Sequence, residues 1–403
     1  MLKVAIIGAG AAGCFCAATL RELAPELPVT LFEAASKPLA KVAITGGGRC
    51  NLTNSFRDIT AEKAYPRGAR VMKRLMEGFS NEDICDWFKS KGVALVTQED
   101  QCVFPRSQNA MQIVNTLLDS LRDNGVRIRT ECPVRRIEAL EKGFCLHMDG
   151  GTAHADIVIA TIGGLSSAGM QELFRGLDLN IEKPVPSLFT FKTDSPVREL
   201  SGTVVNPAQV SLQGTKLSAC GPLLITDWGF SGPAVLKLSS FAARLLADAG
   251  YKGSMTINWM PGSSEQELRT MLQGYAKAFP EKQVSSIHPE GLTSRLWNFI
   301  LDKANVKENI KFAEISKKAE GRLCSTLLCD TYNITGRARF KDEFVTCGGI
   351  ALDQVNKSTL ESVKYKGLYF AGEVLDIDAI TGGFNLQAAW TTAYTVFKSI
   401  TSR

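Results

Sequence analysis

The sequence predicts an α/β protein whose main domain is built on a parallel sheet and is split along the chain by an inserted domain. Three observations carry this prediction. A strand, a glycine-rich turn, a helix and a second strand follow one another within residues 4–33. From about Pro186 the chain changes to short β-type runs and then to a charged helical stretch. A buried strand at 368–370 and a glycine turn then return to the strand-and-turn pattern of the first part.

The first element is a βαβ unit that carries the spacing G-x-G-x-x-G. Its turn consists of Gly8, Gly10, Ala11, Ala12 and Gly13. These small residues allow a tight turn, a close approach of a pyrophosphate and close helix packing, and the helix N-terminus offers N–H groups to phosphates. Glu33 ends the second strand, where a carboxylate can accept both ribose hydroxyls. The unit therefore predicts a Rossmann-type site for FAD or NAD, since NADP would favour a cationic residue at position 33.

A second glycine-rich segment spans residues 45–54. Its three consecutive glycines are followed by Arg, Cys, Asn, Leu, Thr and Asn, which predicts a polar loop able to wrap phosphates and sugar. We expect Arg49 to steady the pyrophosphate rather than an anionic substrate. We expect Cys50 to be a small residue against the ligand rather than a redox thiol.

The rest of the first part alternates helices and strands. Apolar periodicity predicts helices within 69–91 and at 107–124, a hairpin at 92–105, a strand at 125–129 and an antiparallel three-strand excursion at 134–155. A buried strand at 157–160 then ends in the small residues Thr161, Gly163 and Gly164. Because small residues clear space near a nucleotide, we expect this strand to lie beside the first one.

The inserted part begins near Pro186. Short apolar runs at 188–193, 204–212, 216–219, 223–226 and 255–259 are separated by glycine and proline, which predicts a β-rich segment. Residues 265 to about 328 are helical and charged. We interpret the two segments together as an inserted substrate domain.

Composition places the chain among ordinary globular proteins. Its 403 residues are 45% hydrophobic and 22% charged, and no apolar run is long enough to span a bilayer. The net charge of +5 is scattered, so it does not favour nucleic acid. The eleven cysteines lie mostly in apolar runs without regular spacing, which indicates free thiols and a cytoplasmic location. Cys324 and Cys329 have the spacing of a flavin disulfide reductase pair, but they fall in the wrong part of the chain.

The C-terminal segment of the chain distinguishes an FAD site from an NAD site. The strand at 368–370 leads to Glu373 and Asp376, whose carboxylates can accept hydrogen bonds from ribityl hydroxyls. The Thr-Gly-Gly turn at 381–383 opens a helix, and a helix N-terminus stabilises the negative charge of a reduced flavin. The N-terminal βαβ unit and the C-terminal segment together therefore predict FAD.

Several motifs together resemble one bacterial family. They are the Gly-Gly-Arg-Cys-Asn-Leu-Thr-Asn run at 47–54, Val-Phe-Pro at 103–105, the runs at 221–226 and 229–234, Val-Thr-Cys-Gly-Gly-Ile at 345–350, and residues 371–387. Over nearly its whole length the chain resembles the HI0933-like flavoproteins, also called BaiN-like or aminoacetone-oxidase-like. The resemblance implies a glutathione-reductase-like FAD domain at 1–186 and 334–403, an inserted β-barrel at 187–262 and a small helical domain at 263–333.

The resemblance also implies the cofactor residues. Beyond the βαβ set and Glu33, the residues implied are Lys41, Gly47, Gly48, Arg49, Cys50, Asn51, Thr53, Val134, Thr161, Gly163, Gly164, Gly372, Glu373, Asp376, Gly382, Gly383, Phe384, Asn385 and Leu386. The family commonly has Thr-His before its Gly-x-Ser-Gly-Pro stretch, whereas this chain has Asp227. Asp227 and Trp228 either face the active site or form a turn.

The resulting hypothesis is an FAD-dependent oxidoreductase that acts on a small organic substrate. NAD(P)H would bind transiently, because the sequence has no second G-x-G-x-x-G, and oxygen is an alternative acceptor. The alternative is a flavoprotein that acts on RNA, through a basic stripe at Lys303, Lys307, Lys311, Lys317, Lys318 and Arg322, or a non-redox flavin-binding protein. We assign no catalytic residue and expect no metal. His147, His154 and His288 are each expected to be surface or core residues rather than catalysts. The sequence leaves the oligomeric state open.

Overall fold

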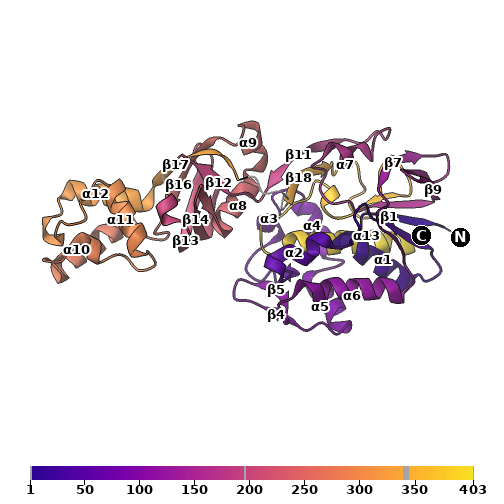
Figure 1. The fold of residues 1–403 in the computed structure, drawn as a ribbon, viewed down its shortest axis with the longest axis horizontal. Helices are drawn as coiled ribbons and strands as arrows, with labels where there is room; N and C mark the ends of the chain where they lie inside the picture. The colour runs from indigo at the N-terminus through magenta and orange to yellow at the C-terminus, as the bar shows by residue number, and fades with distance from the viewer. Residues whose placement is uncertain (1, 195–196, 339–344, 403) are drawn as a thin grey trace. The chain divides into compact units, whose positions relative to one another are not determined.

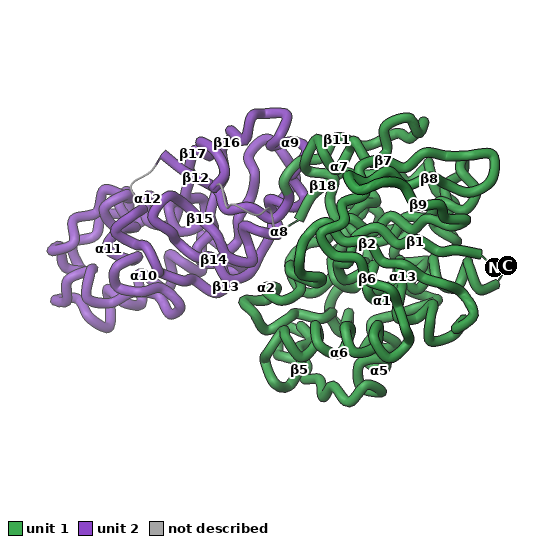
Figure 2. The backbone as a smooth tube through the Cα atoms, turned by 45° about the vertical axis from the view of Figure 1, so that its right-hand side comes forward, with its two compact units in different colours: residues 1–186, 345–403 green, residues 187–344 purple. Residues whose placement is uncertain are grey.

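The computed structural model describes residues 2–194, 197–338 and 345–402, and they form two compact units (Figures 1 and 2). Unit 1 comprises residues 1–186 and 345–403, and unit 2 comprises residues 187–344. Among the described residues, no helix combines the length and the apolar character needed to cross a bilayer.

Unit 1 has a five-stranded parallel sheet at its centre, in the order β19-β10-β1-β2-β6. Its elements are β1 (Val4–Ile7), α1 (Ala11–Leu23), β2 (Val29–Phe32), α2 (Ala40–Gly48), β3 (Thr53–Asn54), α3 (Ala61–Ala64), α4 (Ala69–Met76), α5 (Asn81–Ser90), β4 (Leu95–Thr97), β5 (Cys102–Pro105), α6 (Ala110–Asp123), β6 (Arg127–Arg129), β7 (Val134–Ala139), β8 (Phe144–Met148), β9 (Gly151–Ala155), β10 (Ile157–Ala160), α7 (Ala168–Glu172), β11 (Ile181–Ser187), β18 (Val345–Ile350), β19 (Leu368–Phe370), the short 3₁₀ turn Gly372–Val374 and α13 (Phe384–Thr401).

The central strands are buried and apolar, which is why they form the middle of the sheet. β1 pairs with β10 in parallel, so the strand that ends at Thr161 lies beside the first strand as the sequence predicted. β19, from the far end of the chain, pairs with β10 on its other side. Helices α1 and α13 pack together, and the aromatic rings of Phe15 and Trp390 meet edge to face between them. The two ends of the chain therefore build one core.

Three small sheets surround the central one. β3 joins the predicted hairpin of β4 and β5, β11 pairs with β18, and β7, β8 and β9 form the antiparallel meander expected from the sequence. Helix α5 begins at a capping box in which Ser80 and Asp83 satisfy each other's backbone N–H groups. The 69–91 segment is thereby divided into α4 and α5.

Unit 2 is a closed six-stranded barrel with helices added between its last two strands. Its elements are β12 (Phe191–Thr193), the 3₁₀ turn Arg198–Leu200, β13 (Val204–Leu212), β14 (Ser218–Thr226), β15 (Gly229–Ser231), α8 (Pro233–Phe241), α9 (Ala243–Asp248), β16 (Gly253–Asn258), α10 (Glu265–Ala278), the 3₁₀ turn Val284–Ser286, α11 (Ser294–Lys303), the 3₁₀ turn Phe312–Glu314, α12 (Lys317–Leu328) and β17 (Asp330–Arg337). Within this unit, α10, α11 and α12 gather at one end of the barrel (Figure 1).

Two boundaries expected from the sequence need correction. The run at 223–226 and the end of the run at 216–219 belong to one strand, β14, which is nine residues long. The FAD domain does not resume at residue 334, because β17 pairs with β12 and β16 and so closes the barrel. Unit 1 resumes at Val345, and residues 339–344 of the expected segment lie outside the described range. The helical segment is therefore an insertion within the barrel.

Candidate flavin site

The β1–α1 turn is closed to side chains on one side and open on the other. A Cβ atom at Gly13 would lie 2.0 Å from the Gly8 carbonyl oxygen and 2.6 Å from Thr161 Oγ1. A Cβ at Gly10 would have no atom within 4 Å. Helix α1 has no side-chain cap and no acidic residue in its first turn. The N–H groups of this 13-residue helix are therefore available to an anion that approaches at Gly10.

Glu33 is fixed at the carboxyl end of β2. Its Oε2 accepts a hydrogen bond from the backbone N–H of Ala9 at 2.7 Å, and its Oε1 accepts one from Ala35 N–H at 2.8 Å. Each oxygen keeps a second lone pair. The carboxylate is thus oriented beside the glycine turn and can accept the two hydroxyls of a ribose.

The segment that follows Lys41 is more ordered than the polar loop expected from the sequence. Residues 40–48 are helical in outline, with a break at Thr45, Gly46 and Gly47. Gly47 and Gly48 have φ values of +68° and +80°, and nothing lies within 4 Å of a Cβ at either position. The break therefore exposes backbone toward open space, which suits contact with a ligand.

The cationic side chains of this segment have different surroundings. Lys41 Nζ lies 4.0 Å from Glu373 Oε2, so the lysine joins the N-terminal half to the C-terminal carboxylate. The guanidinium of Arg49 lies 4.5 Å from the centre of the Phe104 ring, and its Nε donates to the Gly46 carbonyl. Arg49 remains exposed, so it can still turn toward a phosphate.

Cys50 is completely buried and has a φ of +61°. Burial raises the pKa of its thiol to about 11, although a hydrogen bond from Thr45 lowers it slightly. A thiol with this pKa is protonated at neutral pH and is a poor nucleophile. This favours the packing role that the sequence suggested.

Asn51 and Thr53 hold the loop to the start of α13. The Asn51 amide, oriented to satisfy both groups, donates to the Thr53 carbonyl at 3.0 Å and accepts from Gly383 N–H at 3.2 Å. The Thr53 hydroxyl donates to Gln387 Oε1 at 2.6 Å. A Cβ at Gly383 would lie 2.4 Å from the Thr53 carbonyl oxygen, so this approach requires glycine.

The turn that opens α13 is rigid. Gly383, with a φ of +89°, is the N-cap residue, and the helix has neither a side-chain cap nor an acid in its first turn. Both amide atoms of Asn385 bond to the backbone of Ala379, at 2.9 and 3.0 Å. Asn385 therefore shapes the turn with its side chain. Phe384 is buried between the rings of Phe56 and Tyr65.

The ends of β10 and β19 meet at Glu373. Glu373 Oε1 accepts from Thr346 N–H at 2.7 Å, and a Cβ at Gly164 would lie 2.3 Å from Thr346 Oγ1. Thr161 donates to the carbonyls of Ile7 and Gly8 and thereby ties β10 to the glycine turn. These contacts bring three distant segments of unit 1 together around one carboxylate.

The remaining predicted residues lie around this centre. Gly372 N–H donates to Thr392 Oγ1 in α13, and its α-carbon faces Ala12 of α1. Gly163 approaches Glu373 Oε2, and Gly382 packs against the Phe384 ring. Asp376 is buried, Leu386 is half-buried, and Val134 is half-buried at the start of β7.

Several residues that no sequence pattern identified support the site. Gln387, Thr346, Tyr65, Arg67 and Asp378 were not singled out. Tyr65 OH donates to the Phe384 carbonyl, and Arg67 forms an ion pair with the fully buried Asp378. The only signal was the position of three of them, Thr346, Asp378 and Gln387, within the family motifs. Apart from Thr346, their role depends on contacts across more than 300 positions, which no local pattern reveals.

The other candidates belong to unit 2. Asp227 and Trp228 form the β14–β15 hairpin turn in unit 2, and Trp228 is 44% exposed. Cys324 is buried in α12, whereas Cys329 is exposed, and both are free thiols. Their separation in burial does not support a redox pair.

Unit 1 thus has two uncapped helix N-termini, an open glycine cradle and two oriented carboxylates, all on a Rossmann-type sheet. This fits the pyrophosphate, the ribose and the flavin end of FAD, and FAD supplies hydride chemistry when bound. The fold and the site define an FAD-dependent oxidoreductase. The chain belongs to the HI0933-like family, because the model of the HI0933-like protein Rossmann domain matches residues 2–399.

Curated relatives span the whole chain. A 3-dehydro-bile acid delta(4,6)-reductase from Clostridium scindens is 27% identical, with 100% of both chains covered. A ribosomal RNA dihydrouridine synthase from Escherichia coli is 28% identical, with 96% of this chain and 95% of the relative covered. Its counterpart from Haemophilus influenzae is also 28% identical, over 98% and 97%.

Solved structures resemble the fold more distantly. An open-conformation flavocytochrome c3 fumarate reductase gives a TM-score of 0.49 at 14% identity, over 100% of this chain and 78% of that one. A 3-ketosteroid-delta4-(5alpha)-dehydrogenase from Rhodococcus jostii gives 0.47 at 11% identity, over 98% and 97%.

Proposed function

We propose that this protein uses FAD to reduce a carbon–carbon double bond conjugated to a carbonyl group in a small organic substrate, with NAD(P)H as the electron donor. The observation that carries the proposal is that relatives with very different substrates share one bond type. The printed name of one describes reduction of a bile acid with a 3-oxo group and 4,6 double bonds. The name of the other describes conversion of uridine, whose 5,6 double bond is conjugated to a carbonyl, to dihydrouridine.

We propose that FAD is held by Gly8, Gly10, Ala11, Ala12, Gly13, Glu33, Lys41, Gly47, Gly48, Arg49, Cys50, Asn51, Thr53, Val134, Thr161, Gly163, Gly164, Gly372, Glu373, Asp376, Gly382, Gly383, Phe384, Asn385 and Leu386. In this arrangement the α1 N-terminus takes the pyrophosphate and Glu33 takes a ribose. Asn51 and Asn385 fix the α13 N-terminus, and its N–H groups face the flavin edge that gains negative charge on reduction. A bound flavin gives the hydride acceptor and donor, so the chain itself needs only to orient the substrate.

The charges of unit 2 favour a small substrate over RNA. In the basic stripe, Lys303 pairs with Asp330 and Lys311 pairs with Glu281. Arg322 donates to the carbonyls of Ala304 and Asn305. Half of the stripe is thus engaged within the protein, and two of its six charges are offset by carboxylates, which reduces the charge left for phosphates.

The test is an anaerobic titration of the flavin-loaded protein with NADH and NADPH. We expect the oxidised flavin spectrum to bleach with one of them. Adding a 4-ene-3-oxosteroid or cyclohexenone as a probe should then restore the oxidised spectrum faster than buffer does. A flavin that neither nicotinamide reduces, or that no conjugated enone reoxidises, would contradict the proposal.

A second candidate is the reduction of uridine in ribosomal RNA. Two relatives that bear this activity in their names cover nearly the whole chain, which is the specific observation in its favour. Incubation of the reduced protein with unmodified ribosomal RNA, followed by nucleoside mass spectrometry, distinguishes the candidates. Dihydrouridine formation without enone turnover would replace the first proposal with the second.

A further inference from the structure

The β7–β8–β9 meander has one apolar face and one face rich in metal-ligand side chains. Ile137, Leu146 and Ala153 stand opposite one another and pack into the core of unit 1. At the neighbouring paired positions of the three strands, Cys145 on β8 lies opposite Glu138 on β7 and His154 on β9. Because paired residues point to the same side of a sheet, these three side chains share the outer face.

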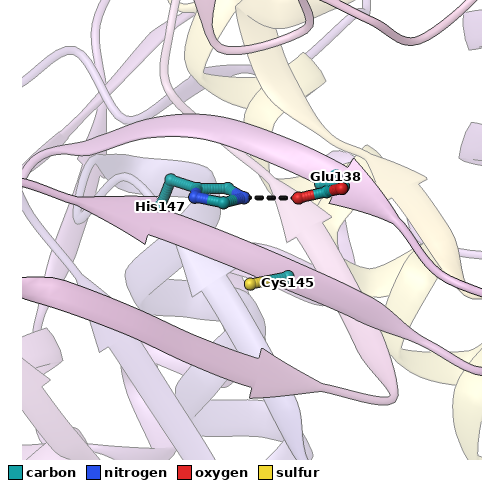
Figure 3. Close-up of side chains that lie close together, drawn as sticks. All are labelled: Glu138, Cys145 and His147. Carbon is teal, nitrogen blue, oxygen red and sulfur yellow. Dashed lines mark hydrogen bonds and ion pairs between the residues drawn. The ribbon is translucent and has the colours of Figure 1, made fainter.

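His147 completes the group. It lies two residues after Cys145 on β8, so it also points to the outer face. Its Nε2 lies 2.6 Å from Glu138 Oε2 (Figure 3). One ligand atom each from Glu138, Cys145 and His147 lie within 4.8 Å of one another. Two of the chain's three histidines therefore occur on one small surface beside a cysteine and a glutamate.

The chemistry of this donor set is selective. A thiolate and imidazole nitrogens bind zinc and similar transition metals, whereas magnesium and calcium prefer sites made of oxygen atoms. Zinc with ligand bonds of about 2.0–2.3 Å needs donor atoms roughly 3–4 Å apart, and the ligand atoms of Glu138, Cys145 and His147 already lie within 4.8 Å of one another. Glu138 and His147 are partly exposed, so an ion can enter from solvent.

We infer that Glu138, Cys145 and His147 form a zinc-class metal site, with His154 as the fourth ligand. The site would pin the three strands of the meander together from the face opposite the core. Each strand contributes at least one ligand, so binding adds a constraint that the hydrogen-bond ladders alone do not supply. The inference is independent of the proposed function, since none of these residues belongs to the flavin set.

The same residues form a metal-free arrangement. Arg136 Nη2 lies 3.5 Å from Glu138 Oε2 and 3.3 Å from His147 Nε2. The Arg136 side chain is 45% exposed, so its guanidinium can turn to solvent when a cation takes its place. If the Arg–Glu–His cluster is permanent, the protein should have no affinity for the metal at this face. A metal-binding experiment therefore distinguishes the cluster from a metal site.

The test is equilibrium dialysis of the flavin-loaded full chain, expressed without a histidine tag, against zinc chloride, with bound metal measured by mass spectrometry. We expect about one zinc per chain. Cys145→Ser, His147→Gln and Glu138→Gln should each weaken binding about tenfold or more, because even the loss of an outer-shell partner costs about that much. Cys329→Ser and His288→Gln, the same substitutions in unit 2, should bind like the wild type.

Zinc should also raise the melting temperature of the wild type and of both controls, but not that of Cys145→Ser or His147→Gln. An unchanged flavin spectrum in every variant shows that the variants fold. The inference is overturned if the wild type binds no zinc, or if Cys145→Ser and His147→Gln bind it like the wild type. His154→Gln tests the fourth ligand, and unchanged affinity in that variant would remove His154 from the site.

Discussion

The hydroxyl of Thr53 donates a 2.6 Å hydrogen bond to Gln387 Oε1, and both residues are fully buried. The pair joins β3 to α13 across 334 positions of the chain. Gln387 Nε2 in turn donates to Thr391 Oγ1, which donates to the Phe79 carbonyl. The glycine loop after Lys41 and the final helix are therefore held by one buried polar network.

Removing the Thr53 hydroxyl should destabilise unit 1. Thr53→Val keeps the shape but leaves Gln387 Oε1 buried without a donor, which costs about 1–3 kcal/mol. Urea unfolding followed by flavin and tryptophan fluorescence measures this loss. Thr97→Val, the same change at an exposed position of β4, is the control and should be nearly neutral. Equal unfolding midpoints for the two variants would contradict the importance of the network.

Substitutions at Gly10 and Gly13 should separate cofactor binding from folding. Gly10→Ala places a methyl group in open space, so the flavin-free protein should keep its melting temperature. Its affinity for FAD should fall about tenfold, or about 1.4 kcal/mol, because the methyl occupies the approach of the pyrophosphate.

Gly13→Ala places a methyl group 2.0 Å from the Gly8 carbonyl oxygen, so the flavin-free protein itself should lose about 1–3 kcal/mol or more. Calorimetric FAD titrations and thermal unfolding distinguish the two variants. If Gly10→Ala bound FAD like the wild type, the pyrophosphate would not lie at this turn.

The raised pKa of Cys50 predicts its reactivity. At pH 8 a thiol with a pKa of about 11 is only about a thousandth thiolate, so iodoacetamide should not label Cys50 in the native protein. The exposed Cys220 and Cys329 should be labelled under the same conditions. Peptide mass spectrometry gives the label at each site. In the Cys50→Ser variant the flavin should still be reduced. Rapid labelling of Cys50 at pH 8 would instead support a redox role for this thiol.

The raised pKa of Cys50 also makes the stability of the protein depend on pH. The folded state holds the Cys50 proton more tightly than the unfolded state, whose pKa is about 8.5. The resulting stabilisation is fully present below about pH 8.5 and is lost as the pH rises toward about 11. The difference in unfolding free energy between wild type and Cys50→Ser should therefore shrink over this interval.

In unit 2, Lys303 should stabilise the fold because it forms an ion pair with the buried carboxylate of Asp330. The Asp330 carboxylate is buried and accepts from Trp259 Nε1 at 3.0 Å and from Tyr332 OH at 2.6 Å, while Lys303 supplies the opposite charge. Burial, followed by the charge of Asp330, raises the pKa of Tyr332, so its phenol stays a donor.

Lys303→Met should cost up to about 3 kcal/mol, because it leaves a buried carboxylate without its cation. Lys307→Met, at an exposed position four residues away, is the control. Thermal unfolding measures both. Since Lys303 joins α11 to β17, an equal effect of the two substitutions would mean that this contact does not stabilise the barrel.

Several elements could be predicted from the sequence because their signals are local. The G-x-G-x-x-G turn, Glu33 and the apolar strands are encoded within a few neighbouring residues, and the structure has them as expected. The barrel boundary could not be predicted in this way. β17 resembles any other half-buried strand, and only its pairing with β12 and β16 assigns it to unit 2.

The class of protein could be inferred from the sequence alone, since turn chemistry and hydrophobic periodicity act over short distances along the chain. The tertiary structure decided which distant side chains meet. Gln387 reaches Thr53, and Glu138 joins Cys145 and His147, only because helix packing and strand register place them together. A shift of one residue in the β7–β8 register would turn Glu138 to the opposite face, and the buried pair Ile137 and Leu146 on the core face holds the register.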